Sequence, residues 1–425
     1  MKLLIICFIT VTIAIESNYG KDIGKLKKLF EWCPENIEFV FKNQKLLKNL
    51  LATGKFIPKN NVPTGIAIHP YKKEMIMAIP RFMPGVLSTL NTVKIGHGKL
   101  NAPLSPYPCW EANDIYGKSK YPYKIISVIR TFVDSCGRLW VIDSGYDKKL
   151  TNRTQIEKPK LLIFDLKTDK LLRIHNFDAS VANTKNSSLG KIVVDVTPKT
   201  CNKAFAYITD VMVPGLIVYN YAENIAYRIE NNYLQLEPLK SSFLVEGKKI
   251  FAGVNIDSIC LSGMYSDRHR NLYASPQLSN KQFITSTKFL RDKDYCSSKS
   301  STLFHYLGER CSNCTPGAQV MDEKTGVMFY SDLNNNAISC WNGDHSKFGP
   351  LTQAQVAVST ELRYVSDLVL TKDRELAALS CDLRTFFYTN KGVTVRVFVG
   401  VVDSLIKGTV CQYHPKVSAS ACCQE

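Results

Sequence analysis

The stretch CGRLWVIDSG, residues 136–145, contains the pattern that decides the fold of this chain. The apolar run LWVI has the composition of a buried β-strand, and it ends at Asp143 followed by Ser144 and Gly145, which favour a turn. Such a strand either presents an acid and a hydroxyl for catalysis or forms one copy of a repeated scaffold. The rest of the chain distinguishes these two interpretations.

The same pattern occurs six times. Apolar runs that break at Pro, Asp or Cys begin at Met75, Leu139, Phe205, Leu272, Val327 and Leu376. Each is preceded by another apolar run and a polar turn, as tight hairpins require, and most are followed by a further β-rich run. A single open sheet of so many strands would be unstable, whereas small sheets repeated around a channel protect their edges. The sequence therefore predicts an all-β fold, a six-bladed β-propeller, with two stacked β-sandwich domains as the alternative.

The N-terminus has the features of a secretory signal peptide. Lys2 precedes the apolar run LLIICFITVTIAI, and small or polar residues follow up to Gly20. The run is too short to span a bilayer, so we expect a secreted protein without membrane insertion rather than one held by an uncleaved anchor.

These features divide the chain into four expected parts. They are a signal peptide (1–20), an N-terminal extension leading into the propeller (21–60), the propeller itself (61–415) and a C-terminal tail (416–425). A short helix is expected within residues 39–54.

Cysteine usage fits an exported protein. Of the 14 cysteines, Cys7 lies in the predicted signal peptide, and the remaining odd number leaves at least one thiol free or paired between chains. The CSNC stretch at 311–314 has the spacing of half a zinc site, but no second Cys or His pair lies nearby, so we favour disulfides and predict no metal. Glycosylation sequons begin at Asn152, Asn186 and Asn313.

The net charge of +17 excludes few partners. A basic surface attracts polyanions, so glycans or an acidic matrix are candidate partners. Nucleic acid is not expected, because the protein is predicted to be exported and its lysines form no stripe with interleaved aromatics.

The sequence lacks the common catalytic motifs. It contains no HExxH, GxSxG, P-loop or EF-hand pattern, and no dinucleotide fingerprint, so no catalytic residue and no cofactor are predicted. Asp143 recurs as Asp210 and Asp332 at the same place in other repeats. A residue type that recurs in a repeat is more often scaffold than catalyst, and such an Asp typically accepts backbone N–H bonds in the next turn.

A ligand site is expected at one mouth of the channel, where first strands begin and second strands end. The residues expected there are Thr64, Arg81, Phe82, Asp143, Asp210, Gln319, Asp332, Ser366, Asp367, Cys381 and Leu383. Carboxylates on this rim could hold an ammonium group, and an aromatic wall could cover a ring.

Several motifs resemble the insect yellow and major royal jelly protein family. They include CGRLWVIDSG, AIPRFMPGVLSTLN, SPYPCWE and ISCWN, and the resemblance runs from Asn60 to Cys411. It implies an extracellular six-bladed propeller. It also implies disulfides Cys136–Cys201 and Cys340–Cys411, and leaves the other nine cysteines unassigned.

The resemblance implies three kinds of function. Some relatives sequester biogenic amines, some convert dopachrome in melanin formation, and some are food or eggshell proteins. In the amine-binding relatives a Thr, an Asn and an aromatic residue hold the amine, and these positions correspond here to Ser366, Cys381 and Leu383. Cysteine is a poor acceptor and leucine has no π face, so two of the three groups differ.

The sequence thus favours a secreted protein that binds a small aromatic amine or catechol-type ligand. Candidate ligand-binding residues are Ser366, Asp367, Cys381, Leu383, Asp332, Asp143 and Phe82. The alternatives are a non-catalytic matrix protein of cuticle, eggshell or secretion, and a dopachrome-converting enzyme. Since no committed acid–base pair is evident, enzymatic activity stays open.

Overall fold

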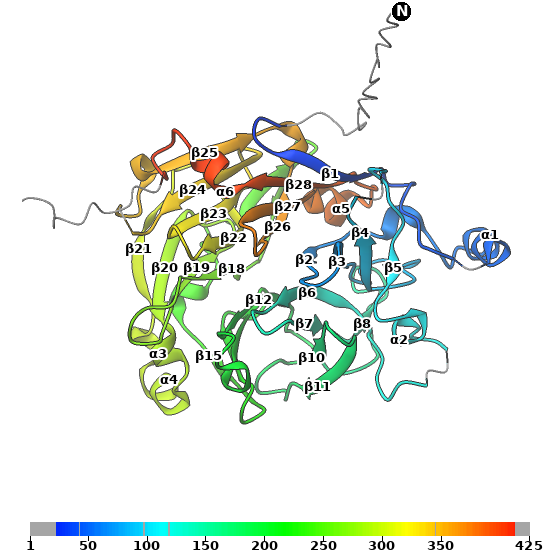
Figure 1. The fold of residues 1–425 in the computed structure, drawn as a ribbon, viewed down its shortest axis with the longest axis horizontal. Coiled ribbons are helices and arrows are strands. Elements are labelled where there is room, and N and C mark those ends of the chain that lie inside the picture. The colour runs from blue at the N-terminus through cyan, green and yellow to red at the C-terminus, as the bar shows by residue number, and fades with distance from the viewer. Residues whose placement is uncertain (1–22, 42, 97, 118–119, 345, 413–425) are drawn as a thin grey trace, which may run out of the picture.

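Six four-stranded antiparallel sheets stand around a central axis in the computed structural model, which describes residues 23–412 except 42, 97, 118–119 and 345. In Figure 1 the chain colour advances blade by blade around the ring. The predicted six-bladed β-propeller is confirmed. The predicted signal peptide (1–20) and C-terminal tail (416–425) lie outside the described residues.

The blades follow chain order, and their strands share one pattern of four antiparallel neighbours. Blades 1 to 3 are β2 (Gly65–Ile68), β3 (Glu74–Ala78), β4 (Leu90–Lys94), β5 (Ser105–Pro106); β6 (Val128–Val133), β7 (Arg138–Asp143), β10 (Lys160–Asp165), β11 (Lys170–Asn176); β12 (Leu189–Asp195), β13 (Phe205–Asp210), β14 (Leu216–Asn220), β15 (Ile225–Ile229). Blades 4 to 6 are β18 (Ile256–Leu261), β19 (Asn271–Pro276), β20 (Lys281–Ser286), β21 (His305–Glu309); β22 (Pro316–Asp322), β23 (Val327–Asp332), β24 (Ala337–Asn342), β25 (Gln353–Val358); β26 (Val365–Leu370), β27 (Glu375–Cys381), β28 (Val395–Val401), β1 (Lys27–Trp32).

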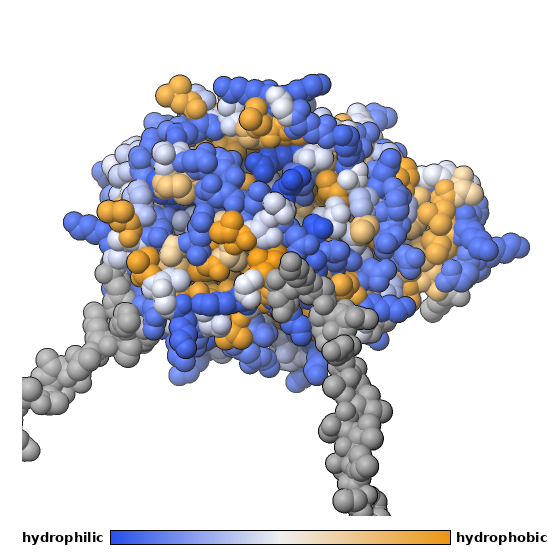
Figure 2. Space-filling view, turned by 90° about the horizontal axis from the view of Figure 1, so that it is seen from above, coloured by the Kyte–Doolittle hydropathy of each residue, from blue (hydrophilic) through white to orange (hydrophobic). Residues whose placement is uncertain are grey.

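Within the described residues, two small hairpins and six short α-helices lie outside the four-stranded blades. They are β8 (Tyr146–Asp147) with β9 (Thr154–Gln155), β16 (Ser242–Val245) with β17 (Lys248–Phe251), α1 (Gln44–Ala52), α2 (Trp110–Asn113), α3 (Thr287–Leu290), α4 (Lys293–Lys299), α5 (Leu383–Thr389) and α6 (Val402–Ile406). The expected helix within 39–54 is α1, which projects from the rim with apolar side chains such as Leu46 exposed (Figures 1 and 2). No helix in the described part of the chain is long and apolar enough to cross a membrane.

The first strands of the blades, β2, β6, β12, β18, β22 and β26, lie next to one another around the channel. We call the end where they begin mouth A and the end where they finish mouth B. The second strand of blade 2 is buried along its whole length, from Arg138 to Asp143, because neighbouring blades cover both of its faces. This explains why the second strands are continuous apolar runs rather than alternating ones.

The ring closes on the N-terminal strand. β1 pairs with β28, Glu31 opposite Arg396, and completes the sixth blade. Phe30 and Trp32 are almost fully buried, and the Trp32 indole donates to the Ala102 carbonyl at 2.9 Å. The segment 21–60, expected to be an extension before the propeller, therefore supplies one of its strands.

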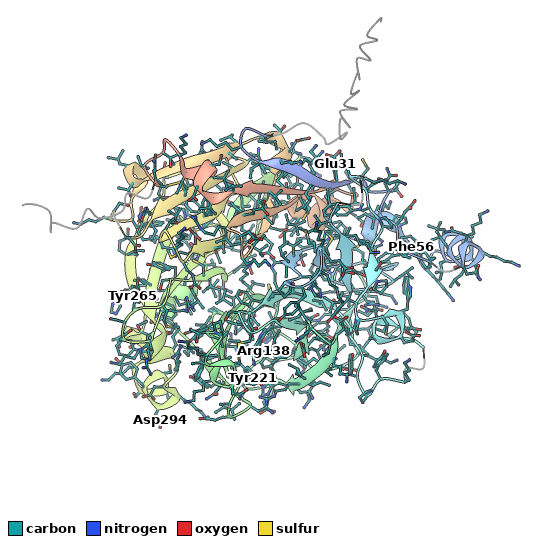
Figure 3. The ribbon with its side chains drawn as sticks, in the orientation of Figure 1. Glu31, Phe56, Arg138, Tyr221, Tyr265 and Asp294 are labelled. Atoms are coloured by element: carbon teal, nitrogen blue, oxygen red, sulfur yellow. A yellow bond between two sulfur atoms is a disulfide. The ribbon has the colours of Figure 1, made fainter. Side chains whose placement is uncertain are left out.

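Both disulfides implied by the family resemblance are present. Cys136–Cys201 joins loops of blades 2 and 3 at mouth B, and Cys340–Cys411 ties blade 5 to the segment after α6. Arg138 reinforces the first of these links, since it donates to the Cys201 carbonyl and stacks 4.6 Å from the Tyr221 ring (Figure 3). A third disulfide joins Cys311 to Cys314, which bears out the preference for a disulfide at this CxxC.

Candidate functional site

The recurring aspartate at the end of the second strand is a scaffold element. Asp143 is fully buried, and its carboxylate accepts the backbone N–H groups of Ile126 at 2.7 Å, Ser127 at 2.8 Å and Gly145 at 2.9 Å. The Lys160 ammonium lies 3.3 Å away. One side chain thus joins the segment before a first strand to the turn after its second strand.

The equivalent residues in other blades do the same. Asp210 accepts from the Ser188 and Met212 amides at 2.9 and 3.2 Å, and Asp332 accepts from the Thr315 amide at 3.2 Å. Burial raises the pKa of Asp332. A ligand bound by Asp143 or Asp332 would have to displace these bonds, so the two predicted rim carboxylates serve the fold.

Four charged side chains from four different first strands line the channel. We call Arg130, Lys191, Asp257 and Asp367 the channel cluster. Lys191 Nζ lies 2.5 Å from Asp367 Oδ1, and Arg130 Nη2 lies 3.8 Å from Asp257 Oδ2. The side chains of Arg130, Lys191 and Asp367 are 8%, 7% and 0% exposed, but that of Asp257 is 21% exposed. Asp257 is therefore the most accessible charge in the cluster.

β-bulges near mouth A place these residues. In five of the six first strands the register with the second strand shifts by one residue near the start of the strand. The shift falls at Asp257 in β18, between Ile256 and Ser258, and at Ser366 in β26, between Val365 and Asp367. A bulge re-aims a side chain and is over-represented beside functional sites. The positions of these bulges are visible only in the strand pairing, because a bulged residue looks like any other strand residue in the sequence.

Asp257 has an unusual electrostatic environment. Its Oδ1 atom has no hydrogen-bond partner among the described residues, and its contact with Arg130 is too long for a hydrogen bond. A Cβ at Gly190 would lie 2.4 Å from Oδ1, so this glycine makes room for the carboxylate. Burial raises the pKa of Asp257, and Arg130 and Lys191 oppose that shift.

An aromatic group absent from the sequence-based site lies at mouth A. Tyr364 directly precedes β26 and interacts electrostatically with Asp257, and its hydroxyl accepts from the Gln277 amide at 2.7 Å. The Arg384 guanidinium on α5 lies 5.5 Å from the Tyr364 ring centre and 5.6 Å from that of Phe243. The β16–β17 hairpin, which carries Phe243, therefore reaches α5 on the opposite side of the ring.

The structure brings some of the predicted ligand residues together. Ser366 Oγ lies 3.6 Å from Cys381 Sγ, and the Cys381 thiol donates to the Pro63 carbonyl at 3.2 Å. Burial raises the pKa of Cys381 to about 12, so the group is a neutral thiol. Leu383 is the first residue of α5 and is buried. Phe82 packs edge-to-face on Phe387 at 5.2 Å.

Lys149 is a further residue that the sequence did not point to. Its ammonium donates to Ser188 Oγ at 2.6 Å and lies 6.0 Å from the Phe82 ring centre. Burial lowers the pKa of Lys149 to about 8, well below that of an ordinary lysine. No motif marks it, because its environment comes from loops of separate blades.

The described residues contain one cluster with metal-binding side chains, formed by Cys311, Cys314 and Asp332. The two sulfurs are bonded to each other, so they are not thiolate ligands in this structure. The three sequon residues, Asn152, Asn186 and Asn313, are exposed on loops, which is compatible with the predicted glycosylation.

Comparison with known proteins identifies the family. The major royal jelly protein family matches residues 126–411. Dopaminechrome tautomerase of Drosophila melanogaster is 30% identical, with 91% of this chain and 84% of that protein aligned. Protein yellow of Drosophila subobscura is 31% identical (91% and 67%), and L-dopachrome tautomerase yellow-f of Drosophila melanogaster is 28% identical (88% and 87%). The chain belongs to the major royal jelly protein family.

Proposed function

We propose that this protein binds a small aromatic amine or catechol-type ligand at mouth A, with Asp257 as the anionic group. The observation that supports this most directly is the position of Asp257, whose side chain lies in a bulge, is 21% exposed, and has one buried oxygen without a hydrogen-bond partner. Tyr364, beside it, offers a ring face and a hydroxyl. A carboxylate next to an aromatic ring suits a protonated aryl amine.

The other charges of the channel cluster determine how much of the negative charge of Asp257 is available to a ligand. Lys191 and Asp367 neutralise each other, and Arg130 balances Asp257 at a longer distance. An incoming ammonium would compete with this 3.8 Å contact. Since Cys381 and Leu383 replace two ligand groups of the amine-binding relatives, the proposed mode relies on Asp257 and Tyr364 instead.

Asp257→Asn is expected to weaken binding of a protonated amine about tenfold or more, because it removes a charged acceptor from a partly buried site. Wild-type affinity should rise with pH as Asp257 ionises, over a range above that of an ordinary carboxyl because its pKa is raised. The variant should lack this rise. Calorimetry with dopamine, serotonin and histamine between pH 4.5 and 7.5 measures both effects.

Asp267→Asn is the matched control, since this carboxylate is 60% exposed and lies on a mouth B loop. It should bind as wild type does. No heat with any of the three amines at micromolar protein, or equal affinity for wild type and Asp257→Asn, would refute the proposed site.

A second candidate is tautomerisation of an aminochrome, which needs only proton transfer. Burial favours it at two groups, since it raises the pKa of Asp257 and lowers that of Lys149 to about 8. Two relatives carry dopaminechrome and L-dopachrome tautomerase in their names. The chain should then accelerate the decay of dopaminechrome or dopachrome, and Asp257→Asn should slow it. Decay at the uncatalysed rate with wild-type protein excludes this activity.

We also propose that the protein is secreted. Its N-terminus has the pattern of a signal peptide, and its three disulfides are typical of an oxidising compartment.

A further inference from the structure

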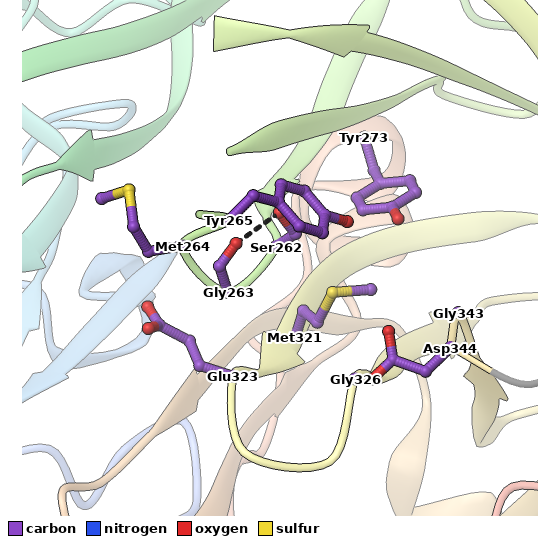
Figure 4. A pocket seen from close by; sticks show the side chains of 10 residues that line it. All are labelled: Ser262, Gly263, Met264, Tyr265, Tyr273, Met321, Glu323, Gly326, Gly343 and Asp344. Atoms are coloured by element: carbon purple, nitrogen blue, oxygen red, sulfur yellow. Dashed lines mark hydrogen bonds between the residues drawn. The ribbon is translucent and has the colours of Figure 1, made fainter. Parts of the chain in front are cut away.

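A separate cavity of about 150 Å³ lies at mouth B, between blades 4 and 5. The β18–β19 loop, the β22–β23 turn and the residues after β24 form its walls, and Tyr273 and Met321 belong to the strands below. Figure 4 shows Tyr265 and Tyr273 on one side, Glu323 and Asp344 on the other, and Met321 between them. Figure 3 places Tyr265 at blade 4, far from Glu31 on β1.

The two carboxylates of the cavity differ in how far they are already neutralised. Glu323 Oε1 forms a salt bridge with Arg270, 2.8 Å from its Nη1, and that arginine also binds Asp195. Asp344 forms no salt bridge with any residue that the structure describes. Its carboxylate is held against Gly326, where a Cβ would lie 2.4 Å from Oδ2 and where φ is +67°. The cavity therefore keeps one uncompensated negative charge in an otherwise basic protein.

The size and lining of the cavity define the chemistry that fits it. A cavity of this volume accommodates about one aromatic ring. Tyrosine faces attract organic cations, and the methionine side chain adapts its shape to a ring. A hard metal ion needs several converging oxygens, whereas Glu323 and Asp344 belong to no three-residue ligand cluster among the described residues.

We infer that this cavity is a second ligand site, independent of mouth A, for a small aryl-alkyl ammonium ion. The ammonium group lies at Asp344, and the ring lies between Tyr265, Tyr273 and Met321. Arg270 already balances Glu323, which makes Asp344 the principal charge in recognition.

Methionine methyl groups provide a site-resolved test with the full chain. Phenethylammonium is titrated into protein carrying ¹³C-methyl methionine, and 2-phenylethanol serves as its neutral analogue. The methyl signals of Met321 and Met264, which line the cavity, should shift with the ammonium ion, and the alcohol should bind at least about tenfold more weakly. Met83, next to Phe82 at mouth A, reports separately on the other site.

Three variants separate recognition from general charge. Asp344→Asn should weaken the Met321 response about tenfold. Glu323→Gln should weaken it less than about threefold, because Glu323 is already paired with Arg270 and that arginine keeps Asp195 as a partner. Asp267→Asn, an equal change of charge on the β18–β19 loop outside the cavity, should leave it unchanged.

The result that overturns the inference is an absence of Met321 and Met264 shifts, or equal weakening by Asp344→Asn and Asp267→Asn. Failure of the proposed site at mouth A can be distinguished from failure of this second site. Asp257→Asn should leave the Met321 response intact whether or not amines bind at mouth A.

Discussion

Replacing Asp367 with alanine is expected to lower the free energy of unfolding by about 3–5 kcal/mol, because it leaves a buried charge without its partner. Asp367 is fully buried, and its carboxylate lies 2.5 Å from the ammonium of Lys191. It also accepts the Ile66 amide at 3.0 Å, which ties blade 6 to blade 1. The change removes both bonds and leaves the Lys191 ammonium in the channel without its ionic partner. The midpoint of guanidinium unfolding measures the loss.

A double variant identifies the cause. Lys191→Met added to Asp367→Ala should restore more than half of the lost stability, because the unpaired charge is then gone. Asp373→Ala, an exposed aspartate in the turn of the same blade, should change stability by less than about 0.5 kcal/mol. A cost below about 1 kcal/mol for Asp367→Ala would show that Lys191 finds another partner or water.

A chain that begins at Glu35, and so lacks β1, is expected not to fold. It would lose the buried side chains of Leu26, Phe30 and Trp32, each worth about 1.5–3 kcal/mol, and would expose the edge of β28. That sum is comparable to the whole stability of a typical domain, about 5–15 kcal/mol. The yield of protease-resistant protein and near-ultraviolet circular dichroism measure the outcome.

Two point variants of the full chain control this deletion. Phe30→Ala should fold but cost about 3–5 kcal/mol, because it empties part of the core beside Trp32. Leu46→Ala on the projecting α1 should have little effect, since that side chain is 48% exposed. A truncated chain with the native circular dichroism spectrum would mean that β1 is dispensable.

The sequence predicts the first three strands of each blade well, because their apolar runs and turn residues are local signals. It does not place β1. KKLFEW, at 27–32, lies far along the chain from its partner β28, and no local pattern records a pairing between Glu31 and Arg396. The sequence therefore assigns 21–60 to an extension leading into the propeller, whereas β1 within this segment pairs with β28.

The residues of the candidate site likewise divide into those that the sequence predicts and those that it does not. The role of Asp143 as scaffold was predictable, because the residue recurs in the repeat. The role of Asp257 in the site was not predictable. In VNIDSICL it is one polar residue within a strand, and only the pairing of β18 with β19 creates the bulge. Tyr364 and Phe243 meet through Arg384 from three separate segments, which spacing along the chain does not reveal.

Closure by β1 also implies a delay during biosynthesis between the synthesis of this strand and that of its partner, β28. Glu31 emerges 365 residues before Arg396, its partner across the last blade. At ordinary translation speeds of about 5–20 residues per second, the interval is roughly 20–70 s. Throughout it, a strand bearing Phe30 and Trp32 has no sheet to join. We therefore expect the aggregation of the newborn chain to depend on elongation rate as well as on the stability of the finished ring.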